Sequence, residues 1–143
     1  MPSLFRHFLA LMTVIAVLVP AHAAGDPPAR VGRLSLVDGN VTYYGSQQDA
    51  GGPALVNWPI SSGAVVNTER GARAEVWIGS TAYRLGSDSQ AEFATVDDRS
   101  VDLLLHGGTL AVTIRDRDQA DDLAVMTPAG QVRFFGTGRY RLE

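Results

Sequence analysis

The chain has 143 residues, of which 45% are hydrophobic, and its formal net charge is −3. This length fits one compact domain, and the hydrophobic content is too high for a disordered chain. The acidic balance argues against a nucleic-acid partner, because such binding depends mainly on clustered cations. The chain has no cysteine, so a packed core must provide its stability without disulfides.

Residues 1–23 have the features of a secretory signal peptide. A short basic start precedes an apolar run over residues 8–19, and the small residues of Ala21-His22-Ala23 follow. The run is shorter than the roughly 20 residues that a membrane span needs. We predict cleavage after Ala23, a periplasmic or otherwise exported location, and no stable membrane anchor after cleavage; the alternative is an uncleaved anchor. Residues 24–32, with two prolines, are expected to form a linker.

From residue 33 onward, short alternating runs are separated by turn residues. A run over residues 33–37 places Leu34 and Leu36 on one face of a strand, and a turn over residues 38–40 leads into a strand over residues 41–44. Such spacing is typical of short strands rather than helices.

The run over residues 72–78 has the clearest alternation in the chain. Its side chains alternate between small or apolar and polar with period two, as in a half-buried strand. One face carries Ala72, Ala74, Val76 and Ile78. The other face carries Arg73, Glu75 and Trp77. We expect the first face in the core and the second outside it.

Two consecutive strands are expected at the end of the chain. Thr127-Pro-Ala-Gly130 turns into a strand over residues 131–135, and Gly136-Thr-Gly138 turns into a strand over residues 139–143. The last strand is expected to lie at an open edge of the domain, where unpaired backbone groups favour docking or aggregation.

These patterns together predict an all-β single domain over residues 33–143. Turn signals recur about every 8–12 residues, and no apolar residues recur at helical spacing over three turns. Short strands of this kind form either a sandwich or a flattened, solenoid-like stack, and the pattern fits both.

No residue pattern indicates catalysis, a cofactor or a metal site. His106 is the only histidine after the predicted signal peptide, and no nucleophile-elbow sequence accompanies it. The carboxylates of residues 115–122 could gather around calcium, but arginines are interleaved among them and the calcium-loop pattern is absent. We interpret this segment as a polar hairpin loop, and the protein as not an enzyme.

Trp77, Arg73 and Glu75 form the candidate partner surface. Trp and Arg are enriched at protein interfaces, and an outward Trp on a strand can mark one. The alternative is that both faces of this strand are covered. Trp58 is expected to be a packed loop anchor beside Pro59.

Four segments in this order resemble the FecR-type domain, a periplasmic β-rich module: residues 31–41, 57–93, 101–114 and 123–142. The strongest matches are Thr68-x-x-Gly71-x-x-Ala74, Gly79-Ser80 with Leu85, Leu103-x-Leu105-x-x-Gly108-x-Leu110 and Thr127-Pro128-x-Gly130. The resemblance implies an exported, non-enzymatic module, and it carries over no catalytic residue.

In sensor regulators of this family, the domain follows a cytoplasmic sigma-factor-binding region and a membrane helix. Only a few residues precede the apolar run here, so we expect no such region. We therefore predict an interaction or scaffold module of the cell envelope that binds one or more envelope proteins. The alternatives are a periplasmic signal-sensing fragment of an iron-transport sigma-factor regulator, and a glycan-binding module.

Overall fold

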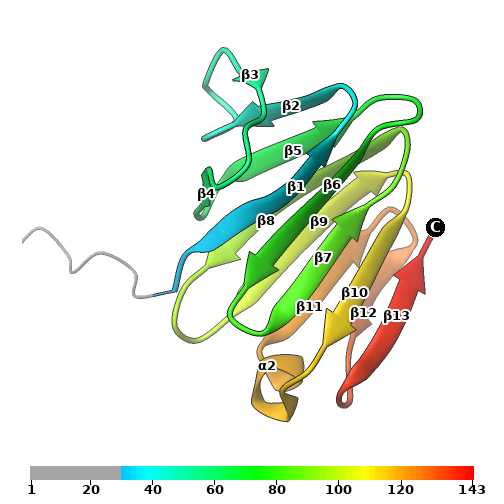
Figure 1. Cartoon of the computed structure of the whole chain (residues 1–143). Helices are drawn as coiled ribbons and strands as arrows, with labels where there is room; N and C mark the ends of the chain where they lie inside the picture. Colours follow the sequence, from blue (N-terminus) through cyan, green and yellow to red (C-terminus); the bar gives the residue numbers. More distant parts are fainter. Residues whose placement is uncertain (1–29) are drawn as a thin grey trace, which may run out of the picture.

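The computed structural model describes residues 30–143, which form two β-sheets packed face to face (Figure 1). The predicted signal peptide and most of the predicted linker lie outside the described residues. Sheet A contains, in spatial order, β13 (Gly138–Leu142), β10 (Leu110–Ile114), β7 (Thr81–Leu85), β6 (Arg73–Ile78), β1 (Gly32–Asp38) and β4 (Pro59–Ile60). Sheet B contains β12 (Gly130–Arg133), β11 (Leu123–Thr127), β9 (Val101–Gly107), β8 (Ser89–Val96), β5 (Ala64–Thr68), β2 (Val41–Tyr44) and β3 (Gly52–Pro53).

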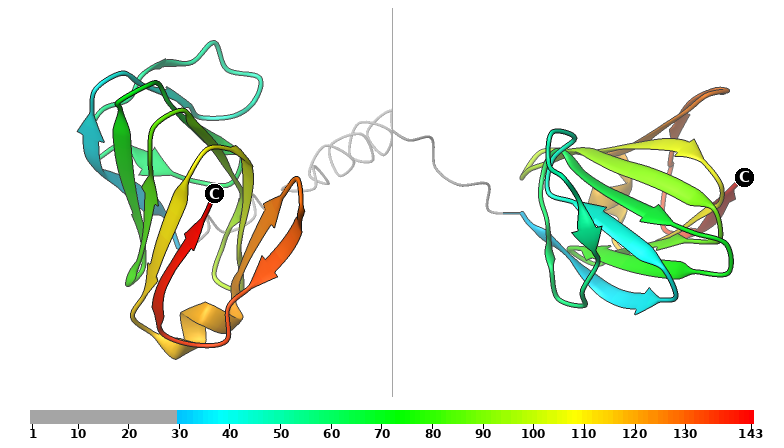
Figure 2. Two further views of the ribbon diagram at one scale, coloured as in Figure 1. Left: turned by 90° about the vertical axis from the view of Figure 1, so that its right-hand side faces the viewer. Right: turned by 90° about the horizontal axis from the view of Figure 1, so that it is seen from above.

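The inner faces of the two sheets share one hydrophobic core. Val76 in sheet A is fully buried (0% exposed), and Ala72, Ala74 and Ile78 are buried with it, as the alternation predicts. The rings of Tyr83 from sheet A and Phe93 from sheet B meet edge to face, 5.8 Å apart. The all-β single domain is thus confirmed, with the layers of a sandwich (Figure 2).

The chain passes repeatedly from one sheet to the other at tight corners. β1 pairs with β6, whereas β2 pairs with β5, so the predicted turn at residues 38–40 joins the two sheets. Gly108 makes the corner between β9 and β10 with a φ of 85°. A Cβ atom at Gly108 would collide with the backbone of Ser89. Glycine is therefore required at this corner, because only glycine adopts positive φ without strain and lets the backbones approach so closely.

A β-bulge in β1 makes the prediction for Leu36 wrong. Leu34 pairs with Val76 and is buried, but the register shifts at Ser35, and Leu36 pairs with Glu75 on the outer face. Leu36 is consequently 43% exposed. The extra residue of a bulge reverses which side chains face inward, so simple alternation fails beyond it.

The segment over residues 115–122 contains a short helix instead of the predicted hairpin loop. Helix α2 (Arg117–Asp121) begins at Asp116, whose side chain accepts a hydrogen bond from the Asp118 backbone N–H at 3.1 Å. It connects β10 of sheet A to β11 of sheet B, which then pairs with β9 in parallel. A hairpin would have kept both strands antiparallel in one sheet, whereas a parallel pair needs a crossover.

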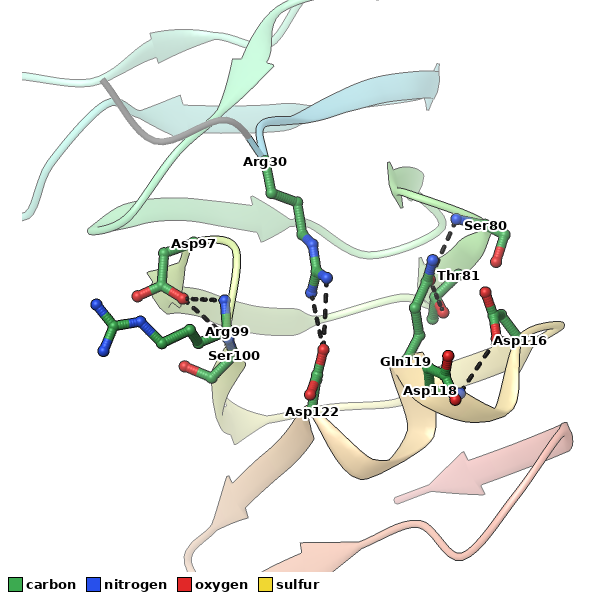
Figure 3. Close-up of polar contacts among 10 residues, drawn as sticks. All are labelled: Arg30, Ser80, Thr81, Asp97, Arg99, Ser100, Asp116, Asp118, Gln119 and Asp122. Carbon is green, nitrogen blue, oxygen red and sulfur yellow. Dashed lines mark hydrogen bonds and ion pairs between the residues drawn. The ribbon is translucent and has the colours of Figure 1, made fainter. Parts of the chain in front are cut away.

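The polar contacts of two side chains, Gln119 and Asp122, fix α2 across the end of the sandwich (Figure 3). Gln119 Oε1 accepts hydrogen bonds from the Ser80 backbone N–H at 3.1 Å and from Thr81 Oγ1 at 2.8 Å. Asp122 pairs with Arg30 at 3.4 Å, which ties the start of the described chain to the same end. The helix therefore closes the sandwich where the chain crosses between the sheets.

The last two strands form as predicted, but they lie in different sheets. β12 is the edge strand of sheet B and β13 the edge strand of sheet A. Phe134 and Tyr140 join them through an edge-to-face contact with ring centroids 4.8 Å apart. β13 pairs with β10 on one side only, as expected for a strand at an open edge.

Trp58 packs against the core beside Pro59, in agreement with its predicted role as a loop anchor. Its ring meets Tyr43 edge to face at 5.2 Å, and its carbonyl accepts a hydrogen bond from Leu34 N–H. None of the helices in residues 30–143 has the length and apolar character needed to cross a membrane.

Candidate interaction face on sheet A

The outer face of sheet A contains the three side chains that the sequence singled out. Arg73, Glu75 and Trp77 project from alternate positions of β6, opposite to the buried Ala74 and Val76. Neighbouring strands extend this face. Leu36 of β1 lies on one side of Glu75, and Arg84 of β7 lies on the other. The alternation of β6 therefore brings the predicted residues together as expected.

Glu75 is the centre of a hydrogen-bonded network on this face. Its carboxylate accepts from Ser35 Oγ at 2.7 Å and from Trp77 Nε1 at 2.5 Å, and the Arg84 guanidinium lies 2.5 Å away. Burial alone would raise the pKa of Glu75, but the hydrogen bonds and the positive charge of Arg84 outweigh it and lower that pKa. Glu75 is thus held ionised, with its neighbours fixed around it.

Trp77 is half-buried, and a second arginine covers one side of its ring. The Arg115 guanidinium carbon lies 4.8 Å from the ring centroid, which is a cation–π contact. Across the strands, Trp77 pairs with Ala82, whose small side chain leaves room for the indole. The outer face of β6 is therefore neither fully open nor fully covered. The Trp77 ring packs on the sheet and stays partly exposed.

Arg73 is the most exposed of the three predicted residues. Its side chain is 68% exposed, and its guanidinium forms an ion pair with Asp38 of β1 at 2.5 Å. Leu36, Arg73, Glu75 and Arg84 line a shallow hollow of about 220 Å³. The bulge in β1 thus provides an apolar wall beside two arginines and the half-buried carboxylate of Glu75. The alternation alone could not have revealed Leu36 here.

Arginine dominates the remainder of this face. Strand pairing places Arg33 beside Trp77, and it places Arg139 and Arg141 of β13 on the same side of the sheet. Together with Arg73, Arg84 and Arg115, this gives six arginines. The face has three carboxylates: Asp38, Glu75, and Glu143, which pairs with Arg141. Its formal charge is therefore +3, on a chain whose overall charge is −3.

The other polar residues considered from the sequence lie elsewhere. His106 is on the outer face of sheet B, where its Nε2 lies 3.2 Å from Glu92 Oε2. The acidic residues around α2 act as a helix cap and as the partner of Arg30. Within residues 30–143, no three His, Cys, Asp or Glu side chains are arranged to hold a metal ion.

No model of a known protein family, no curated protein and no solved structure matches this chain. The resemblance to the FecR-type domain therefore stays a prediction from the sequence motifs.

Proposed function

We propose that this protein is a non-enzymatic, exported interaction module of the FecR type that binds an acidic protein of the cell envelope. The binding surface is the outer face of sheet A around Trp77, Arg73 and Glu75. The observation that carries this proposal is the concentration of six arginines around a partly exposed tryptophan on an otherwise acidic chain.

The fixed geometry of this face supports a role in recognition. Glu75 holds Ser35, Trp77 and Arg84 in place through hydrogen bonds, and Arg115 holds the indole from above. Side chains that are already ordered lose less conformational entropy when a partner binds. Trp and Arg are also the residue types that most often dominate the energy of a protein interface.

The charge of the face supports an acidic partner. Arg33 and Arg139 lie at the two sides of the Trp77 row, separated by four strand intervals or roughly 19 Å. The arginines therefore extend from β1 to β13, across five of the six strands of sheet A. Complementary charge speeds association and selects the partner, because like charges oppose docking.

Affinity capture from an envelope extract tests this proposal. We expect the wild-type protein to enrich one acidic envelope protein, and Arg33→Glu combined with Arg139→Glu to abolish that enrichment. The matched control is Arg133→Glu, since Arg133 is an exposed arginine on β12 of sheet B. The enrichment should also fall as salt rises, because exposed charges are screened.

Equal capture by the wild-type protein and by the double variant would overturn the proposal. Enrichment of an outer-membrane transporter would favour the alternative role in iron-transport signalling, and it would still place the partner on this face if the double variant abolished it.

A further inference from the structure

A second hollow lies on the opposite side of the molecule, on the outer face of sheet B. It has a volume of about 380 Å³ and is lined mainly by polar side chains: Tyr44, Gln47, Asn67, Gln90, Glu92 and His106. Val65 forms an apolar part of its floor. None of these residues takes part in the face on sheet A, so this hollow is a separate feature.

Strand register brings the polar groups together. Asn67 of β5 pairs directly with Gln90 of β8, and two residues along the same strands Val65 pairs with Glu92. Residues two apart on a strand point to the same side, and directly paired residues are close neighbours. The amides of Asn67 and Gln90 therefore lie side by side on adjacent strands, and the carboxylate of Glu92 lies two residues further along β8 on the same face.

The carboxylate in this hollow is held in a fixed position. The Glu92 side chain is only 11% exposed, and its Oε2 lies 3.2 Å from His106 Nε2. A carboxylate offers about four lone-pair positions, so this one contact leaves acceptor capacity for other donors. The exposed imidazole at the rim belongs to the same polar cluster.

Asn67 provides an acceptor that the protein itself does not use. Its Oδ1 atom is buried and has no hydrogen-bond partner among the described residues. Buried polar atoms are nearly always paired, so such an exception calls for an explanation. Asn67 lines the hollow, so a rotation of its side-chain amide would bring this oxygen, which has almost no accessible surface as it stands, to a ligand hydroxyl.

The loop after β2 forms the wall of the hollow and orients Tyr44. Gly51 has a φ of 68° and lies against the Tyr44 ring, where any Cβ atom would collide with it. The loop is braced by the hydrogen bond from Ser46 N–H to Asp49 Oδ2 at 2.7 Å. The aromatic ring is therefore fixed beside the amides.

We propose that this hollow binds a neutral saccharide through its hydroxyl groups. Amides, a carboxylate and an imidazole supply both donors and acceptors, which match groups that can do both. The Tyr44 ring offers an apolar surface for the C–H side of a sugar ring. The negative charge of Glu92 disfavours anionic ligands, and the described residues do not provide the three ligands of a metal site.

Titration of the purified protein followed by two-dimensional NMR tests this site. The probes are cellobiose, maltose and N,N′-diacetylchitobiose, with inorganic phosphate and ethanolamine as charged comparisons. We expect at least one disaccharide to shift the side-chain amide signals of Asn67 and Gln90 with a dissociation constant in the millimolar range. Asn67→Ala should weaken that binding about 3- to 10-fold, as expected for one lost hydrogen bond.

Gln131→Ala is the matched control, because Gln131 is an exposed amide on β12 at the far edge of the same sheet. Gln90→Ala provides a second, exposed site variant should Asn67→Ala fail to fold. The proposal is overturned if no disaccharide shifts these signals, if ethanolamine or phosphate alone does so, or if the site variants bind as tightly as the control. These readouts are independent of capture by the sheet A face.

Discussion

Individual residues decide which side of β6 belongs to the core. Val76 lies between the sheets with no exposed area, whereas Arg73 is largely exposed and forms an exposed ion pair with Asp38. The two positions therefore differ sharply in what a substitution would disturb, although they are three residues apart on one strand.

We expect Val76→Asp to unfold the domain. An unpaired charge in the core costs several kcal/mol, which is a large share of the roughly 5–15 kcal/mol that stabilise a typical domain. Arg73→Ala should cost less than about 1 kcal/mol, because exposed ion pairs contribute little. Thermal and urea unfolding would measure both. Comparable melting of the two variants would show that the assignment of faces is wrong.

Glu75 makes the stability of the protein depend on pH. Its pKa is lower in the folded protein than the ordinary value of 4.5, despite the opposing effect of burial. The stabilisation by its carboxylate is therefore complete above that ordinary value, and it is lost as the pH falls through the lower folded pKa. We expect Glu75→Gln to lower the free energy of unfolding by about 1 kcal/mol at pH 7.

This deficit of Glu75→Gln should shrink as the pH falls below 4.5, because the wild-type carboxyl then becomes protonated as well. Urea unfolding at a series of pH values would measure it. A deficit that stays constant from pH 7 to pH 3 would contradict the role of the charged carboxylate.

At the scale of the elements, the corners hold the two sheets together. Gly107 and Gly108 are adjacent at the end of β9, yet they differ in their surroundings. A Cβ atom at Gly107 would meet no atom within 4 Å. A Cβ atom at Gly108 would collide with Ser89, and any residue at this position must also adopt a positive φ.

We expect Gly108→Ala to destabilise the domain by about 1–3 kcal/mol, because alanine is strained in the left-handed region and collides with the backbone of Ser89. Gly107→Ala should have a much smaller effect and serves as the control. Chemical unfolding of both variants gives the comparison, and equal losses would mean that the corner does not depend on this conformation.

The elements also show what the sequence could and could not predict. Alternation correctly assigned the faces of residues 72–78 and the existence of the last two strands, because period-two burial is local. It failed at Leu36, where one extra residue in β1 reverses the register. It missed α2 as well, because a helix of five residues is too short to show a periodic apolar face.

At the scale of the whole molecule, strand pairing joins residues that are distant in the sequence. The sequence predicted an all-β domain, but it could not assign strands to sheets, because turns within a sheet and corners between sheets use the same glycine and aspartate residues. The candidate face could likewise be predicted only in part from the sequence. The alternation predicted its β6 residues, whereas Arg84, Arg139 and Arg141 join them only through pairing between strands.

The interleaved path of the chain predicts a single unfolding transition. Consecutive strands such as β1 and β2, or β9 and β10, lie in opposite sheets, so neither sheet can be completed without the other. Thermal unfolding followed by tryptophan fluorescence, which reports on Trp58 and Trp77, should coincide with unfolding followed by circular dichroism. Separate midpoints would indicate that part of the sandwich is stable by itself.

The parallel pairing of β9 with β11 has a consequence for how the chain acquires this structure. Between these strands the chain must first lay β10 into sheet A and then turn through α2, so their contact closes a loop that is itself part of the other layer. Such non-local contacts slow the search for the native state, which places folding times in the millisecond-to-second range for sandwiches of this kind. Until that loop closes, Leu103 and Val125 have no neighbour across the strand pair. These apolar side chains therefore stay exposed in the partly folded chain until a late step, and a chaperone would bind the chain there before that step.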